Sequence, residues 1–328
     1  MEYRYFGKTG VRVSEICLGT MTFGKEADEA TSRAMMDRAL DAGVNFFDTA
    51  DIYNKGLTEK IIGRWIKPHR DKIVLATKVH FPVGPGPNDS GSSRRHIVME
   101  VENCLRRLKC DWIDVLYLHH WDDHTALEES LSAITTLVEQ GKVYYAGVSN
   151  FSAWQTMKAV AVAQARGFAP IVCVQPMYNL VKRQAEVEIL PLAQEEGLAV
   201  CAYSPVAAGL LTGKYLRGET GRITEHPMYT ERYKNSQYTE TAAQFVEYAR
   251  QRNVSPSALA TAWVIGHPAI TSAIVGARNL NQLNEALQAA DLTLSPEQRA
   301  EITSLSIDPP LATDREPTSI AMSILVKK

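Results

Sequence analysis

Short apolar segments rich in Val, Ile and Phe recur along the chain, and a stretch with helical periodicity follows each of them. This alternation is the sequence pattern of repeated βα units with parallel strands. We count eight strands, at residues 16–18, 44–48, 73–77, 113–118, 144–148, 171–175, 199–203 and 273–275. Eight such units predict an α/β fold, a TIM (β/α)8 barrel, in preference to a doubly wound sheet.

Glycines mark the expected ends of several helices. Gly43, Gly141 and Gly197 each come just before a strand, and glycine adopts the left-handed conformation of a helix C-cap without strain. Ahead of the first barrel strand, residues 7–10 read Gly-Lys-Thr-Gly between two short stretches with strand character. We therefore expect an N-terminal β-hairpin that closes the bottom of the barrel.

Two segments exceed what a simple barrel needs. The stretch between the seventh and eighth strands is too long for one helix, and its polar part, residues 217–239, follows the carboxyl end of a strand. Barrel enzymes place their active sites at that end, so we expect a lid over a ligand. The tail, residues 306–328, contains three prolines and then an apolar run at 320–326. Its sequence allows it to edge the substrate pocket or to pack on a neighbouring subunit.

The composition limits which kinds of molecule we expect the protein to bind. With 328 residues, 45% of them hydrophobic, the chain is long enough for a single barrel domain spanning residues 1–328. A net charge of -2 provides no general attraction for nucleic acid or membrane, and the N-terminus lacks the pattern of a signal peptide. We expect a cytoplasmic protein with a small-molecule partner. The five cysteines include no C-x-x-C pair, which favours reduced packing residues.

Four polar residues with complementary chemistry stand at or near the ends of three consecutive strands: Asp48, Tyr53, Lys78 and His119. The carboxyl ends of parallel strands meet at one rim of a barrel, so we expect these side chains to lie together. A phenol has a pKa of about 10, and a nearby ammonium stabilises the phenolate. Lys78 can supply that charge and Asp48 its counter-ion. His119 can orient a substrate oxygen, so the quartet favours proton delivery to a carbonyl.

Two other chemistries fit parts of this pattern. A lysine at the end of a barrel strand can act as the amine nucleophile of a Schiff-base aldolase, but the phenol and the carboxylate argue against that interpretation. The stretch His-His-Trp-Asp-Asp-His at 119–124 contains residues that bind zinc or iron. Adjacent side chains rarely point at one centre, so we expect no metal site there.

Five stretches closely resemble the aldo-keto reductase superfamily and follow its order. They are Gly-Thr-Met at 19–21, Phe-Asp-Thr-Ala-Asp-Ile-Tyr at 47–53, Asp-Val-Leu-Tyr-Leu-His at 114–119, Gly-Lys-Val-Tyr-Tyr-Ala-Gly-Val-Ser-Asn-Phe at 141–151 and Tyr-Ser-Pro at 203–205. The resemblance spans nearly the whole chain, and in the lid it is greatest to the branch with the potassium-channel β-subunits and many bacterial reductases. It implies a nicotinamide-dependent barrel in which the quartet is catalytic.

The resemblance also implies the cofactor, NADPH/NADP+. The chain has no G-x-G-x-x-G after a strand, so a Rossmann site is not indicated. The stretch 209–214 falls one residue short of a P-loop, yet its glycines and lysine can offer N–H groups and a cation to a pyrophosphate. Arg278 at a helix start, with Arg222 from the lid, suits the ribose phosphate and favours NADPH over NADH.

Individual cofactor contacts are implied in the same way. By resemblance, Ser149, Asn150 and Gln175 hold the nicotinamide amide, whose donors and acceptors they match, and Tyr203 stacks on the ring. The whole implied set is Thr20, Met21, Ser149, Asn150, Gln175, Tyr203, Ser204, Pro205, Leu210, Gly213, Lys214, Arg222, Gly276, Arg278, Gln282 and Glu285.

The expected function is NADPH-dependent reduction of an aldehyde or ketone to an alcohol, with Tyr53 as the proton donor. Phe23, Phe81 and Trp121, together with Met21, are expected to line an apolar substrate pocket. The alternative is a nucleotide-binding redox-sensing or regulatory subunit with slow catalysis. A homo-oligomer fits either function, and the sequence does not name the substrate.

Overall fold

Eight parallel strands close into a barrel in the computed structural model, which describes residues 1–313. They run in the order β10, β3, β4, β5, β6, β7, β8, β9, and β9 pairs again with β10. Their bounds are β3 Ile16–Gly19, β4 Phe46–Asp48, β5 Val74–Val79, β6 Ile113–Leu118, β7 Val143–Ser149, β8 Ile171–Gln175, β9 Ala199–Tyr203 and β10 Ser272–Gly276. The predicted barrel is confirmed, and the predicted strands differ from the observed ones only at their ends.

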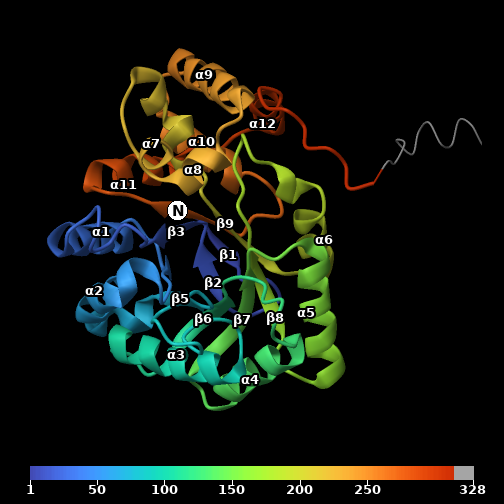
Figure 1. Cartoon of the computed structure of the whole chain (residues 1–328). Helices are drawn as coiled ribbons and strands as arrows, with labels where there is room; N and C mark the ends of the chain where they lie inside the picture. Colours follow the sequence, from blue (N-terminus) through green and yellow to red (C-terminus); the bar gives the residue numbers. More distant parts are fainter. Residues whose placement is uncertain (314–328) are drawn as a thin grey trace, which may run out of the picture.

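Helices surround the strands (Figure 1). The first six, α1 Glu29–Asp41, α2 Leu57–Trp65, α3 Arg94–Leu108, α4 Leu127–Glu139, α5 Ala153–Arg166 and α6 Ile189–Glu196, follow β3 to β8 in turn. The others gather at the top of the view: α7 Arg222–Glu225, α8 Pro227–Arg232, α9 Ser236–Gln251, α10 Pro256–Ile265, α11 Leu280–Leu287 and α12 Pro296–Thr303. Gly43, Gly141 and Gly197 have φ of +85°, +71° and +66°, as their predicted role at helix ends requires.

An antiparallel hairpin, β1 Tyr3–Tyr5 with β2 Arg12–Ser14, precedes the barrel, as predicted. Phe6 is fully buried and meets Phe46 edge to face with ring centroids 5.7 Å apart. A Cβ on Gly7 would lie 2.8 Å from the carbonyl oxygen of Val172 and 2.9 Å from the amide nitrogen of Ala199. Both contacts lie at the amino-terminal ends of β8 and β9, so the hairpin closes the barrel end opposite the carboxyl ends of the strands.

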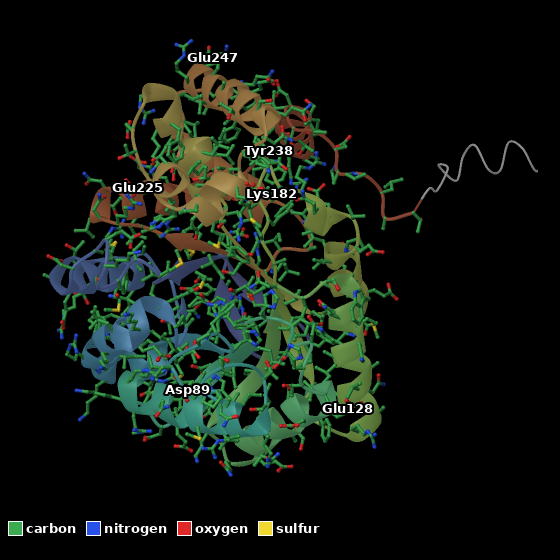
Figure 2. The ribbon with its side chains drawn as sticks, viewed as in Figure 1. Asp89, Glu128, Lys182, Glu225, Tyr238 and Glu247 are labelled. Atoms are coloured by element: carbon green, nitrogen blue, oxygen red, sulfur yellow. The ribbon has the colours of Figure 1, made fainter. Side chains whose placement is uncertain are left out.

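The segment predicted as a lid, residues 217–239, contains α7 and α8 and the start of α9. Tyr229 and Arg232 of α8 lie close enough to Tyr203, the last residue of β9, to influence its pKa. The segment is also fastened to the barrel, because the Lys182 ammonium of the loop after β8 lies 5.3 Å from the ring centroid of Tyr238 in α9 (Figure 2). The insertion therefore lies beside the carboxyl end of β9.

The start of the tail is held by an ion pair. The guanidinium of Arg183, itself largely buried, contacts Asp308 at 2.8 Å and Glu186 at 2.8 Å. The apolar run at 320–326, for which two locations were predicted, lies outside the described residues.

The five cysteines are free thiols, and all except the partly buried Cys110 are fully enclosed. Cys17, Cys173 and Cys201 pack in the apolar interior of the barrel around Tyr117. Burial raises the pKa of each of these three thiols, which makes them poor nucleophiles. Among residues 1–313, no helix is both long and apolar enough to cross a membrane.

Gly63 sets the distance between α2 and α3. A Cβ at this position would lie 2.2 Å from the carbonyl oxygen of Arg107 and 2.9 Å from the Cα of Leu108, and backbone cannot move aside as a side chain can. We expect Gly63→Ala to lower the free energy of unfolding by about 3 kcal/mol, measured by urea denaturation. Gly10→Ala is the control, because nothing lies within 4 Å of its added Cβ. Equal losses in the two variants would contradict the packing argument.

Candidate active site

The barrel brings the four predicted catalytic residues to one rim. Asp48 ends β4, Lys78 lies near the end of the adjacent β5, and His119 directly follows β6. Tyr53 begins η1 Tyr53–Gly56, the turn that leads from β4 into α2. Asp48, Lys78 and His119 are buried, whereas Tyr53 is partly exposed. Because β4, β5 and β6 are parallel neighbours, residues far apart in the chain share this rim.

Lys78 is at the centre of the arrangement. Its Nζ lies 2.5 Å from Oδ1 of Asp48 and donates to the carbonyl oxygen of Thr49 at 2.7 Å. It also donates to the phenolic oxygen of Tyr53 at 3.3 Å. The other carboxylate oxygen of Asp48 accepts from Nε2 of Gln175 at 2.8 Å. An ammonium has three donors, so all three donors of Lys78 are in use.

The electrostatics of this group favour a charged lysine and a protonated phenol. Burial alone would lower the pKa of Lys78, but the ion pair with Asp48 outweighs burial and raises that pKa above its usual value. Burial raises the pKa of Tyr53, and the ammonium of Lys78 opposes that shift. Tyr53 therefore keeps its proton at neutral pH, next to a cation that would stabilise the phenolate once the proton leaves.

His119 completes the rim as a neutral imidazole. Burial, reinforced by the charge of Lys78, lowers its pKa well below the usual value. Its ring meets Tyr53 at 6.2 Å and Phe81 at 4.8 Å between centroids, in both cases edge to face. Nδ1 of His119 is buried and has no hydrogen-bond partner within residues 1–313. A neutral imidazole beside the phenol can donate to or accept from a substrate oxygen.

The residues predicted to hold a nicotinamide amide lie next to this quartet and are linked to one another. Asn150 donates from Nδ2 to the carbonyl oxygen of His119 at 2.9 Å, and its Oδ1 accepts from the hydroxyl of Tyr203 at 2.7 Å. Ser149 Oγ donates to the carbonyl oxygen of Gln175 at 3.1 Å. Asn150 has φ of +58°, a left-handed conformation that asparagine tolerates better than most residues. The two hydrogen bonds of Asn150 fix the orientation of its amide side chain.

Further members of the predicted cofactor set line the same rim. Thr20 follows β3 and donates to the carbonyl oxygen of Asp48 at 2.8 Å, with Met21 partly exposed beside it. Ser204 follows β9 with φ of +60°, and Pro205 comes next. Leu210 is buried within η4 Ala207–Thr212.

Three cations meet where the phosphates were predicted. Burial lowers the pKa of Lys214, and the nearby guanidiniums of Arg278 and Arg222 lower it further, while the carboxylates of Glu225 and Glu219 partly oppose them. Gly213, with φ of +76°, turns the chain directly before Lys214. The three side chains come from η5 Lys214–Arg217, α7 and the loop after β10. Mutual repulsion of this kind is relieved by an anion, so this donor set fits a phosphorylated nucleotide.

The start of α11 lies next to Arg278 and contributes further members of the predicted cofactor set. Asn279 caps the helix by accepting from the amide of Gln282 at 3.0 Å, and the side chain of Gln282 accepts from the amide of Arg278 at 3.0 Å. Gly276, the last residue of β10, is exposed, and so is Glu285 one turn into the helix. These residues lie together around the start of α11.

The three aromatics predicted to line the substrate pocket lie in different surroundings. Phe81 is partly exposed against His119. Trp121 packs edge to face on Phe151 and on the exposed Trp154, with both centroid distances 5.3 Å. Phe23 is fully buried in the hydrophobic core, so it has no surface to offer a substrate.

Sequence reasoning missed several contributors. The Thr49 carbonyl binds Lys78 through the backbone, which no residue pattern reveals. Gln175 was assigned to the cofactor alone, but its side chain also binds Asp48. Tyr229 belongs to an insertion whose path had no sequence signal, yet it lies close enough to Tyr53 to influence its pKa. Asp51 was named only within the motif at 47–53, but its Oδ1 accepts from the amide of Ile52, the residue before Tyr53.

The stretch 119–124 does not form a shared ligand set. His119 is buried, whereas His120 is exposed and its Nδ1 contacts the carbonyl of Trp121 at 2.8 Å. Within the described part of the chain, no group of three or more His, Cys, Asp or Glu side chains could hold a metal ion.

Comparison with known proteins finds relatives over nearly the whole chain. The model of the Aldo/keto reductase family matches residues 15–307. Uncharacterized oxidoreductase YrpG of Bacillus subtilis is 42% identical over 309 residues, covering 90% of this chain and 93% of that protein. A probable voltage-gated potassium channel subunit beta of Oryza sativa is 36% identical over 328 residues, covering 96% and 99%. L-glyceraldehyde 3-phosphate reductase of Escherichia coli K12 is 32% identical over 317 residues, covering 92% and 91%.

Proposed function

This chain belongs to the aldo/keto reductase family, as its sequence motifs predicted, and from that premise we propose that it reduces an aldehyde or ketone with NADPH. Tyr53 is the proposed proton donor. The observation that carries the proposal is the position of the Lys78 ammonium, 2.5 Å from Asp48 and 3.3 Å from the phenolic oxygen. It places a fixed positive charge where a phenolate would form.

Each residue of the quartet has a distinct part in the proposed reaction. Tyr53 holds the proton at Oη and gives it to the substrate oxygen as negative charge develops there. Lys78 stabilises the resulting phenolate, and Asp48 keeps Lys78 charged inside the buried site. His119, neutral at physiological pH, fixes the direction of the substrate oxygen through a hydrogen bond.

A bound nicotinamide cofactor would supply the hydride, which no side chain can carry. Ser149, Asn150 and Gln175 would hold its amide, and Lys214, Arg222 and Arg278 its phosphates. Their donor and charge pattern fits those groups.

Lys78 does not provide the free amine that a Schiff-base aldolase needs. Its pKa is raised, and all three of its donors are engaged. Carbonyl reduction therefore fits the quartet better than aldol chemistry does.

Cofactor choice is tested by Arg278→Ala. Loss of one charged hydrogen bond corresponds to about a tenfold or greater rise in the Kd for NADPH, whereas NADH lacks the phosphate and should bind within about twofold of wild type. Both affinities can be measured by fluorescence titration. Arg217→Ala is the matched control, because Arg217 is exposed and paired with Glu219 at 2.8 Å. An equal loss for both nucleotides would remove Arg278 from the phosphate site.

The similarity to a protein named as a potassium channel subunit supports a second function, a nucleotide-binding regulatory subunit with slow catalysis. The two functions are separated by NADPH consumption with aromatic, aliphatic and sugar aldehydes. Turnover on any of these substrates supports the reductase. Tight NADPH binding without turnover supports the regulatory subunit. In either case the proposed partners are small molecules in the cytoplasm, with a homo-oligomer as a further proposal.

A further inference from the structure

The turn that carries Tyr53 is strained. The two residues after Tyr53, Asn54 and Lys55, have φ of +46° and +54°, a region that costs free energy for residues other than glycine. Such a turn persists only where its surroundings hold it. Asn54 donates from Nδ2 to the carbonyl oxygen of Gly24 at 2.5 Å. The amide of Asp51 donates to the carbonyl oxygen of Lys78 at 3.2 Å, which ties the segment to β5.

The Asp51 side chain shapes the peptide that leads into Tyr53. Its Oδ1 accepts from the amide of Ile52, the residue directly before Tyr53, at 2.6 Å. Its other oxygen, Oδ2, is buried and has no hydrogen-bond partner within the described residues. Asp51 also lines a pocket of about 360 Å³ with Lys55, Arg107 of α3 and residues 82–84 of the loop after β5.

Beneath the turn, buried carboxyl groups outnumber cations. Arg107 binds Glu59 through Nε at 2.6 Å and Glu100 through Nη2 at 2.6 Å, which commits its charge to those two carboxylates. Asp51, Glu59 and Glu100 are buried, with exposed fractions of 1%, 0% and 2%. Thr77 Oγ1 donates to Glu59 at 2.7 Å, so this network reaches β5 next to Lys78. Of these three carboxyl groups, Asp51 is the one that forms no ion pair with Arg107 in the described part of the chain.

The side chains that face Asp51 come from three elements, and a fourth, β5, meets it through the backbone. They are Lys55 of η1, Glu59 of α2, and Glu100, Cys104 and Arg107 of α3. From β5, Lys78 meets Asp51 through its backbone carbonyl, while its ammonium is bound to Asp48 and Thr49. An ionised Asp51 would thus add a third buried negative charge beside one shared guanidinium, at considerable cost.

We propose that Asp51 is a positioning residue for Tyr53 and that it acts as the neutral carboxylic acid. In this form its carbonyl oxygen still accepts from Ile52, and no uncompensated charge forces the turn away from α2 and α3. The consequence for catalysis rests on the proposed function. When Asp51 loses its proton, repulsion from Glu59 and Glu100 displaces the turn and moves the phenol out of line with Lys78 and His119.

The pH range follows from the direction of the shift. Burial and the charges of Glu59 and Glu100 raise the pKa of Asp51 to about 8, whereas an aspartate in an unfolded chain titrates near 3.9. The folded state therefore binds a proton that the unfolded state has lost. The stabilisation of the folded state by the Asp51 proton is complete below the pKa of the unfolded chain. It declines as the pH rises and is lost as Asp51 ionises near pH 8.

The test compares wild type, Asp51→Asn and Asp51→Ala. With saturating NADPH, wild-type kcat should fall about tenfold from pH 7 to pH 9, because one pH unit above its pKa about nine-tenths of an acid is ionised. Asp51→Asn cannot ionise and still offers an oxygen to Ile52, so its kcat should change less than about twofold over that range. Asp51→Ala loses that oxygen, and its kcat at pH 7 should be about tenfold below that of Asp51→Asn, with the same KM for NADPH.

Two further variants keep the test decisive. Glu100→Gln removes one of the charges that keep Asp51 protonated, so its alkaline fall in kcat should begin at a lower pH than in wild type. Glu128→Gln removes an exposed carboxylate on α4, labelled in Figure 2, and should leave the pH profile of the wild type in place. The proposal is overturned if Asp51→Asn keeps the wild-type alkaline fall, or if Glu100→Gln does not shift it.

A second measurement separates this proposal from the proposed function. Thermal unfolding of the same proteins needs no substrate. Between pH 6 and pH 9, the Tm of wild type should fall further than the Tm of Asp51→Asn. If no carbonyl compound is reduced, the reductase fails and the Tm comparison alone decides the state of Asp51. Parallel Tm profiles would show that Asp51 carries no proton in the folded protein.

Discussion

Replacing Tyr53 with phenylalanine is expected to lower kcat for carbonyl reduction about a thousandfold. The substitution keeps the ring that packs against His119 and removes only the hydroxyl that lies 3.3 Å from Lys78. Asp48 and Thr49 still bind the ammonium, so the site should keep its shape. What the variant lacks is the proton that the developing alkoxide needs.

Two measurements are required for this variant: steady-state turnover and NADPH affinity by fluorescence titration. The affinity should stay within about twofold of wild type, because Tyr53 is not among the proposed cofactor contacts. Tyr144→Phe is a matched control, since it removes the hydroxyl of an exposed tyrosine at the start of β7. Turnover of Tyr53→Phe close to that of wild type would move the proton-donor role to another group of the site, such as His119.

Replacing Lys78 with methionine is expected to have the largest effect on stability. Lys78 and Asp48 are both buried, and the variant leaves Asp48 with Gln175 as its remaining side-chain partner. Removing one member of a buried ion pair typically costs about 3 to 5 kcal/mol, because the other charge stays in the protein without compensation. Urea denaturation at pH 7 measures this loss, and turnover should disappear with it.

The double variant Asp48→Asn with Lys78→Met isolates the cause of that loss. An asparagine needs no counter-ion, so the free energy of unfolding should recover part of the way towards wild type while turnover stays absent. A double variant as unstable as Lys78→Met alone would indicate that lost packing, and not an unpaired carboxylate, accounts for the loss.

The fold was predictable because strand and helix periodicities alternate cleanly and because glycines mark helix ends. Once the strands are assigned, geometry places Asp48, Lys78 and His119 at a common rim, since parallel neighbours end on the same side. The hairpin was predictable for a similar reason, because a Gly-Lys-Thr-Gly turn between two short strands has few alternatives.

Sequence alone could not reach contacts that depend on packing between distant elements. An apolar residue near a strand end can face the core or a pocket, so nothing in the sequence distinguished Phe23, which is buried, from Phe81, which is partly exposed. The charge imbalance at Asp51 arises only when α2 and α3 bring Glu59 and Glu100 beneath the turn. Tyr229 reaches the site through an insertion whose path no periodicity describes.

The barrel closes where β3, its first strand, pairs with β10, its last, with Ile16 opposite Ala273. During synthesis on the ribosome, the nascent chain therefore exposes Asp48, Lys78 and His119 long before β10 has emerged. Until then the sheet has two free edges, and the segments with Lys214 and Arg278 have no complete rim on which to assemble. Pairings of such long range form late and expose apolar surface meanwhile. The rim proposed to hold the nucleotide is therefore completed only at the end of synthesis, and until then the two free edges of the sheet are open to wrong pairings.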